Sequence, residues 1–197
     1  MTGVLFIVVL IVGFVLMGDG TDAEEPVEEI VAFYADNKDE IQIGAFVGVL
    51  AGLLLMAFGA YLRSFLRRAV GEDSILPSLA FIGTVIVALS LAIDSTISFA
   101  LAESADNIDP AAVQALQALW DSDFIPFILG IITFLLGAGL AILRSDVLPK
   151  WLGGLMILAL IIGFTPIGWA AGLVAAVSIL ILSVLLTMRA RSAPAAG

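Results

Sequence analysis

The chain has 197 residues, of which 61% are hydrophobic and only 13% are charged, and its mean hydropathy is +1.17. Soluble domains are about 45–50% apolar and about 25% charged, and a domain of this size could not bury so much apolar surface. The absence of cysteine and histidine excludes disulfides, thiolate nucleophiles, Cys/His zinc sites and Ser-His catalysis. The composition therefore predicts an integral membrane protein that is not an enzyme and uses no cofactor.

The first apolar run covers residues 3–17. Fifteen helical residues reach about 22 Å, which is short of the roughly 30 Å hydrocarbon core of a bilayer. The run is therefore either a short first span or the apolar region of a signal peptide. No basic residue precedes it, and only Gly18 and Gly20 offer a small-residue cleavage site. We expect a retained first helix.

Five further apolar segments follow, and the last two are separated by the turn signal "GFTPIGW" at residues 163–169. Proline lacks a backbone N–H, so Pro166 with its neighbouring glycines marks a break between two helices. The fold class predicted is all-α: a six-helix transmembrane bundle forming a single integral membrane domain over residues 1–197. Its spans are expected at about 3–17, 41–62, 75–101, 124–143, 148–164 and 167–188.

Two polar connections are long enough to carry short helices of their own. In the first, Val27, Ile30 and Tyr34 follow helical spacing. In the second, Asp109 can cap a helix whose first position is Pro110. We expect two short helices on the outer surface, and ordered loops remain the alternative.

The positions of the basic residues predict the orientation in the membrane, because cytoplasmic loops are enriched in lysine and arginine. With six spans and a cytoplasmic N-terminus, seven of the eight basic residues lie inside and only Lys38 lies outside. Fourteen of the eighteen acidic residues lie outside, which divides the net charge of −10 between the two faces. Both termini are therefore predicted to be cytoplasmic. The seven internal basic residues are Arg63, Arg67, Arg68, Arg144, Lys150, Arg189 and Arg191.

Small residues recur at intervals of four in two of the predicted spans. Gly44, Gly48 and Gly52 form one such series, and Gly168 and Gly172 begin another. Small residues let helices approach closely in lipid, where no hydrophobic effect drives their association. These faces are predicted to pack helices within the chain. A homo-oligomer joined through them remains open.

One charge lies inside an apolar segment. Asp94 belongs to the third predicted span, and Ser90 and Ser98 share its helical face. A carboxylate facing hydrocarbon is costly, so it either marks the outer end of the span or binds a proton or cation within the bundle. These three residues form the candidate intramembrane polar site.

The stretches "IVAFYADN" (residues 30–37) and "LPKWLG" (residues 148–153) resemble a loosely defined set of bacterial multi-pass membrane proteins. The set is familiar from actinobacteria and has no assigned function. The resemblance covers most of the chain. It implies a six-helix membrane protein but brings no activity and no functional residues.

These observations lead to one expected function and one alternative. We expect a non-enzymatic protein of the bacterial inner (plasma) membrane with a structural or interaction role in the cell envelope. Its expected partner is the lipid bilayer, with no nucleic acid and no metal. The alternative is a small transporter or channel that uses Asp94 as a proton or cation site. A polar central cavity would favour transport, and an apolar, close-packed interior would favour the structural role.

Overall fold

The structure, a computed structural model, describes residues 1–18, 20–165 and 167–192, the last three of them by backbone alone. Within these ranges the regular structure is entirely helical, which confirms the all-α prediction. A helix is present in each segment for which the sequence predicts one. The helices are α1 (Thr2–Met17), α2 (Val27–Asp36), α3 (Lys38–Val70), α4 (Leu76–Ser104), α5 (Pro110–Ser122), α6 (Phe124–Leu143), α7 (Lys150–Ile162) and α8 (Trp169–Ser192).

Four of the described segments are long and apolar enough to cross a membrane. They are α3, α4, the consecutive helices α5 and α6, and residues Trp169–Arg189 of α8. A crossing needs about 20 apolar residues, and α1 and α7 have 16 and 13. The chain is therefore a multi-pass membrane protein by the length and composition of its helices.

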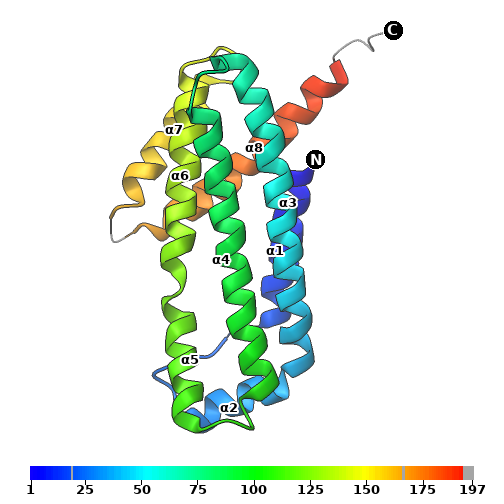
Figure 1. Cartoon of the computed structure of the whole chain (residues 1–197), viewed down its shortest axis with the longest axis vertical. Coiled ribbons are helices and arrows are strands. Elements are labelled where there is room, and N and C mark those ends of the chain that lie inside the picture. Colours follow the sequence, from blue (N-terminus) through cyan, green and yellow to red (C-terminus); the bar gives the residue numbers. More distant parts are fainter. Residues whose placement is uncertain (19, 166, 193–197) are drawn as a thin grey trace.

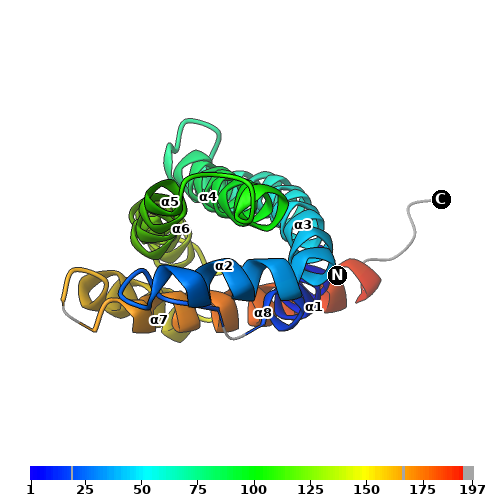
Figure 2. The ribbon, with the colours of Figure 1, turned by 90° about the horizontal axis from the view of Figure 1, so that it is seen from below.

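The long helices run side by side along the long axis of the molecule, and α8 crosses them obliquely (Figure 1). Seen along that axis, α3, α4 and α6 form an arc that α1 and α8 complete (Figure 2). A large cluster of buried apolar side chains fills the space between these helices and includes Phe58, Leu135 and Leu182. Many large apolar side chains point outward instead, as expected for helices that are solvated by lipid.

Glycines bring α4 and α6 into direct backbone contact. A Cβ on Gly83 would overlap the backbone nitrogen of Phe134, and a Cβ on Gly130 would lie 2.7 Å from the nitrogen of Val87. A Cβ on Gly137 of α6 would likewise overlap the backbone of Ala80 in α4. Such contacts are possible only where one partner has no side chain, so they fix how these two helices cross.

A second apolar cluster lies at one end of the bundle, where α2 and α5 pack against the adjoining ends of α3 and α4. We call this region the cap. Its core includes Ile30 and Tyr34 of α2, Val113 of α5 and Leu101 of α4. The Tyr34 hydroxyl donates a buried hydrogen bond of 2.7 Å to Oε1 of Gln117, which ties α2 to α5.

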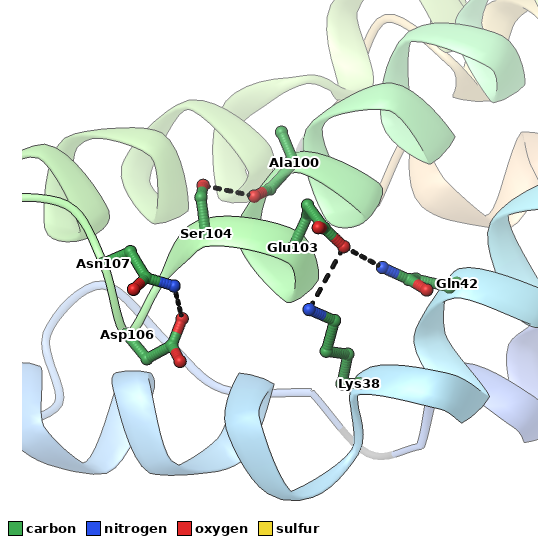
Figure 3. A network of polar contacts seen from close by, with 7 residues as sticks. All are labelled: Lys38, Gln42, Ala100, Glu103, Ser104, Asp106 and Asn107. Atoms are coloured by element: carbon green, nitrogen blue, oxygen red, sulfur yellow. Dashed lines mark hydrogen bonds and ion pairs between the residues drawn. The ribbon is translucent and has the colours of Figure 1, made fainter.

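The rim of the cap carries a small polar network (Figure 3). Glu103 at the end of α4 forms an ion pair of 3.1 Å with Lys38 and accepts a hydrogen bond of 2.6 Å from Gln42, both on α3. Ser104 donates to the carbonyl of Ala100 in its own helix. The two contacts of Glu103 join the start of α3 to the end of α4. They are exposed, so their net contribution to stability is small.

The last two helices differ in extent from the predicted spans. The helix expected over residues 148–164 is only Lys150–Ile162, and α8 begins at Trp169 rather than at residue 167. Gly168 consequently lies in the turn before α8, and not on a helix face as predicted. Gly163 at the end of α7 lies beside Ile132, and a Cβ there would be 3.4 Å from Cγ1 of that residue. The α7–α8 turn therefore lies beside the middle of α6 (Figure 1).

Candidate functional site

Asp94 lies between the two apolar clusters of the protein. Leu91, one turn earlier in α4, belongs to the bundle core, and Ile97, one turn later, belongs to the cap. The Asp94 side chain is half-buried and lines a pocket of about 270 Å³. We call this the acidic pocket, because Asp94 shares it with Asp121 and Asp123.

The local fold of α5 and α6 brings these two further carboxylates to Asp94. Asp109 caps the start of α5 by accepting a hydrogen bond of 2.8 Å from the backbone nitrogen of Ala111. The helix then ends after Ser122, and Asp123 separates it from α6. Asp121 and Asp123 consequently stand at the junction of the two helices, beside Asp94 in the cap-side part of the predicted third span.

The carboxylates of Asp121 and Asp123 differ in the hydrogen bonds that they accept. Asp121 accepts hydrogen bonds from the backbone nitrogen of Ala23 (2.9 Å) and from Nε2 of Gln117 (2.8 Å). Oδ2 of Asp123 is buried and accepts none from the described residues. Asp123 also lies close enough to Asp94 for the two charges to repel one another. The pocket therefore holds carboxylate oxygens that the protein leaves free.

Trp120 forms an aromatic wall of the acidic pocket. Its indole nitrogen is buried and approaches the Asp94 carboxylate without reaching hydrogen-bonding geometry. Phe14 of α1 and Phe124 and Phe127 of α6 complete the aromatic lining. The pocket thus combines carboxylates with ring faces, two features that favour a positively charged group.

Within the described residues, no basic side chain neutralises the acidic pocket. The ion pairs found there join Lys38 to Glu103 and Lys150 to Asp146, and neither involves a pocket residue. No three acidic side chains of this part of the chain converge closely enough to hold a metal ion. The pocket therefore carries an excess of negative charge without the geometry of a metal site.

The three residues of the predicted polar site are only partly brought together. Ser90 lines the acidic pocket with Asp94. Ser98 is buried on the cap side, and its hydroxyl donates to the backbone carbonyl of Asp94 at 3.0 Å, not to the carboxylate. The sequence reasoning missed Trp120, Asp121 and Asp123 as partners of Asp94. The available signal was the cap at Asp109, which marks the start of α5, together with the acidic residues Asp121 and Asp123 that follow one helix length later.

A second cavity, of about 260 Å³, lies between α1, α3, α4, α6 and α8, and it is open on one side, because Trp169 and Leu173 in its lining are mostly exposed. We call it the apolar cavity, because Thr84 is the only hydroxyl-bearing residue in its lining. The Thr84 hydroxyl donates to the carbonyl of Phe81 in its own helix at 2.7 Å, so it offers the cavity no free donor. Trp169 and Gly172 of α8 form part of the opposite wall.

The glycines predicted to pack helices lie against different partners. A Cβ on Gly44 would lie 2.7 Å from Cγ of Met17 in α1, whereas a Cβ on Gly52 would lie 3.3 Å from the backbone carbonyl oxygen of Ala88 in α4. A Cβ on Gly48 would lie 2.7 Å from the hydroxyl oxygen of Ser95, also in α4. This series therefore packs α3 against two neighbours within the same chain.

Gly172 has more room than the glycines of α3. A Cβ there would lie 3.5 Å from Cδ1 of Ile131, which is an ordinary van der Waals distance. The residue lines the apolar cavity, so its lack of a side chain adds to the space inside the bundle.

Comparison of the chain with known protein families, with characterised proteins and with solved structures finds no match. The resemblance to a bacterial family is therefore supported only as far as the multi-pass helical architecture, and the conclusion at this point is that the chain is a helical integral membrane protein.

Proposed function

We propose that this chain is a non-enzymatic protein of the bacterial plasma membrane with a structural or interaction role in the cell envelope. The observation that carries the proposal is the direct backbone contact between α4 and α6 through Gly83, Gly130 and Gly137. Helices that touch along their backbones leave no room between them for a polar path. The apolar cavity beside this contact has an almost wholly apolar lining, which favours a structural role over ion passage.

The polar side chains of the long helices support the same conclusion. Thr84, Thr133 and Thr187 each donate to a carbonyl three or four residues earlier in their own helix. A hydroxyl paired in this way satisfies its hydrogen bond in hydrocarbon and does not solvate a passing ion. The polar groups of the acidic pocket lie instead at the boundary between bundle and cap.

The orientation proposed places the cap outside the cell and both chain ends in the cytoplasm. The seven basic residues of the predicted inner side all lie at or near the end of the bundle opposite the cap: in the last two turns of α3, between the end of α6 and the start of α7, and near the end of α8. Helices α7 and α8 form a hairpin that enters and leaves on this basic side. The two short helices α2 and α5 then cover the outer surface.

Reporter fusions test this orientation. Fusions after residues 69 and 146 should report a cytoplasmic position, and fusions near residues 30 and 108 should report an external one. If positions 30 and 69 exchanged sides, or lay on the same side, the orientation would be wrong. The role itself is tested by deleting the gene and measuring envelope integrity. If the deletion lowers integrity and the Asp94→Asn variant restores it, the result supports a structural role.

The runner-up function is a small transporter or channel in which Asp94 binds a proton or cation. Two observations favour it: the acidic pocket has no basic partner among the described residues, and Ser178 and Ser183 of α8 keep buried hydroxyls without a hydrogen-bond partner. Proteoliposomes separate the two functions. A proton or cation flux that Asp94→Asn abolishes would establish transport, and an equal background flux in both proteins would support the structural role.

A further inference from the structure

The acidic pocket and the apolar cavity follow one another along the same helices. On α1, Leu10 lines the apolar cavity and Phe14 lines the acidic pocket. On α4, Val87 lines the apolar cavity and Leu91 lines the acidic pocket. Phe127 of α6 lines both spaces. Four residues of helix advance by about 6 Å, so the two spaces are about one helical turn apart. The two spaces are therefore neighbours along the bundle.

The deeper space suits a hydrocarbon chain. Its lining is apolar except for Thr84, whose hydroxyl is already paired with the Phe81 carbonyl. A closed engineered cavity of about 150 Å³ with a similar lining stays dry and binds benzene, whereas the apolar cavity is open on one side, where an alkyl chain can enter. The apolar cavity, at about 260 Å³, is larger, so an alkyl chain would gain contacts there that water cannot make.

The outer space suits a cationic group. Asp94, Asp121 and Asp123 line it without a basic partner among the described residues, and Oδ2 of Asp123 is buried and unpaired. An ammonium group has three donors and no acceptor, which matches the unpaired Oδ2 of Asp123 and the neighbouring Asp94 carboxylate. Trp120 and Phe124 add aromatic rings to the lining, and such rings attract the same charge.

We propose that the two spaces together bind a single-chain amphiphile with a cationic head, such as a long-chain primary amine. The alkyl chain lies in the apolar cavity among α1, α4, α6 and α8, and the ammonium group lies between Asp94 and Asp123. This binding site goes beyond the proposed structural role and does not depend on it.

The chain's own tryptophans allow a direct test in nanodiscs of phosphatidylcholine. Trp169 lines the apolar cavity, whereas Trp151 lies at the start of α7 and lines neither space. Dodecylamine brominated at the far end of its chain is added to two variants in which phenylalanine replaces Trp120 and so keeps an aromatic wall. One of these variants retains only Trp169 and the other retains only Trp151. Bromine quenches nearby indoles, so Trp151 reports the amine that has merely partitioned into the bilayer.

The proposal predicts saturable quenching of Trp169 that unlabelled dodecylamine reverses, above the linear quenching of Trp151. The amine should bind at least about tenfold more tightly than the equally brominated dodecanol, which corresponds to about 1.4 kcal/mol. Asp94→Asn and Asp123→Asn should each remove most of this preference and leave the affinity for the alcohol unchanged. Equal affinities for amine and alcohol in the Trp169 variant that keeps Asp94 and Asp123, or no saturable quenching of Trp169, would overturn it.

Filling the apolar cavity supplies a second arm. Ala175 is buried and lines this cavity, so Ala175→Leu should abolish saturable quenching by both ligands. Gly154→Ala on α7 is the matched control, because its added methyl group meets nothing within 4 Å, and it should bind as the wild type does. Full binding by a folded Ala175→Leu protein would contradict the site. If that variant does not fold, the ratio of the amine affinity to the alcohol affinity, measured with Ala175 in place, tests the proposal by itself.

Discussion

Gly83 of α4 lies directly against the backbone nitrogen of Phe134 in α6, so close that a methyl group on the glycine would overlap that nitrogen. The neighbouring carbonyl of Gly130 would lie 2.7 Å from the same methyl group. A backbone atom cannot turn aside as the end of a side chain can. Any side chain at Gly83 must therefore push the two helices apart.

We expect Gly83→Ala to destabilise the protein, because overpacking a close contact costs about 1–3 kcal/mol. Gly154→Ala is the matched control, since it adds the same methyl group to a helix at a position with open space. Alanine is the better helix former by up to about 1 kcal/mol, so the control should be neutral or stabilising. Thermal unfolding in detergent measures both. Equal stability of the two variants would mean that α4 and α6 are not in backbone contact.

The helices themselves could be predicted from the sequence because strong local signals mark them. Apolar runs bounded by charges define α3, α4 and α6, and the Asp109–Pro110 pair marks the start of α5. Each of these signals acts within a few residues, so it can be recognised without knowledge of the rest of the fold. The contact between Gly83 and Phe134 could not be recognised in this way. The α6 glycines involved, Gly130 and Gly137, are seven residues apart rather than four.

The candidate site was predicted only in part, because its residues come from separate helices. Asp94 could be singled out as a charge in an apolar run, but nothing near it in the sequence indicates Asp121 or Asp123. They meet only because α5 and α6 follow one another along the side of α4. The depth of the α7–α8 turn could not be predicted either. The basic residues lie on the same side of the membrane whether the hairpin turns beside Ile132 or reaches the outer surface. Their positions in the sequence therefore do not distinguish the two depths.

Tyr34→Phe should loosen the cap. The substitution removes the 2.7 Å hydrogen bond to Gln117 and leaves the buried Oε1 of that residue without its donor. Losing one partner of a buried hydrogen bond costs about 1–3 kcal/mol. Hydrogen exchange of the α2 and α5 amides should rise while that of α4 and α6 stays slow. Tyr61→Phe, at an exposed tyrosine on α3, is the control and should leave exchange unchanged. Slow exchange of α2 in Tyr34→Phe would show that this bond contributes little.

The cap should also lose stability at high pH. Burial raises the pKa of Tyr34 above its ordinary value of about 10, and the nearby charges of Asp121 and Asp94 raise it further. Below pH of about 10 the phenol is neutral in both the folded and the unfolded state, so it adds no pH dependence. Above that pH the unfolded tyrosine releases its proton while the folded one keeps it, and the free energy of unfolding falls as pH rises.

Chemical unfolding of the wild type and of Tyr34→Phe over an alkaline pH series measures this effect. The wild type should lose stability more steeply than the variant above pH of about 10, because only the wild type carries the buried phenol. Parallel curves for the two proteins would show that Tyr34 ionises as easily in the cap as in the unfolded chain.

The α7–α8 turn should lie within the bilayer and not at the outer surface. Gly163 lies beside Ile132, which is eight residues or about 12 Å from the start of α6 at Phe124. The turn is largely apolar, and the backbone nitrogens of Gly163, Phe164, Thr165 and Gly168 donate to carbonyls within the hairpin. A turn in hydrocarbon requires such pairing, because no water is present to replace it.

Cysteine labelling tests this placement cleanly, because the chain has no cysteine of its own. Thr165→Cys places a thiol at the turn, and Ala118→Cys places one on the exposed surface of α5 in the cap. A membrane-impermeant maleimide added to intact spheroplasts should label Ala118→Cys and leave Thr165→Cys unlabelled. Thr165→Cys should react once detergent or denaturant opens the bilayer, which shows that its thiol is intact. Equal labelling of both variants in spheroplasts would place the turn at the outer surface, and α7 and α8 would then be two full spans.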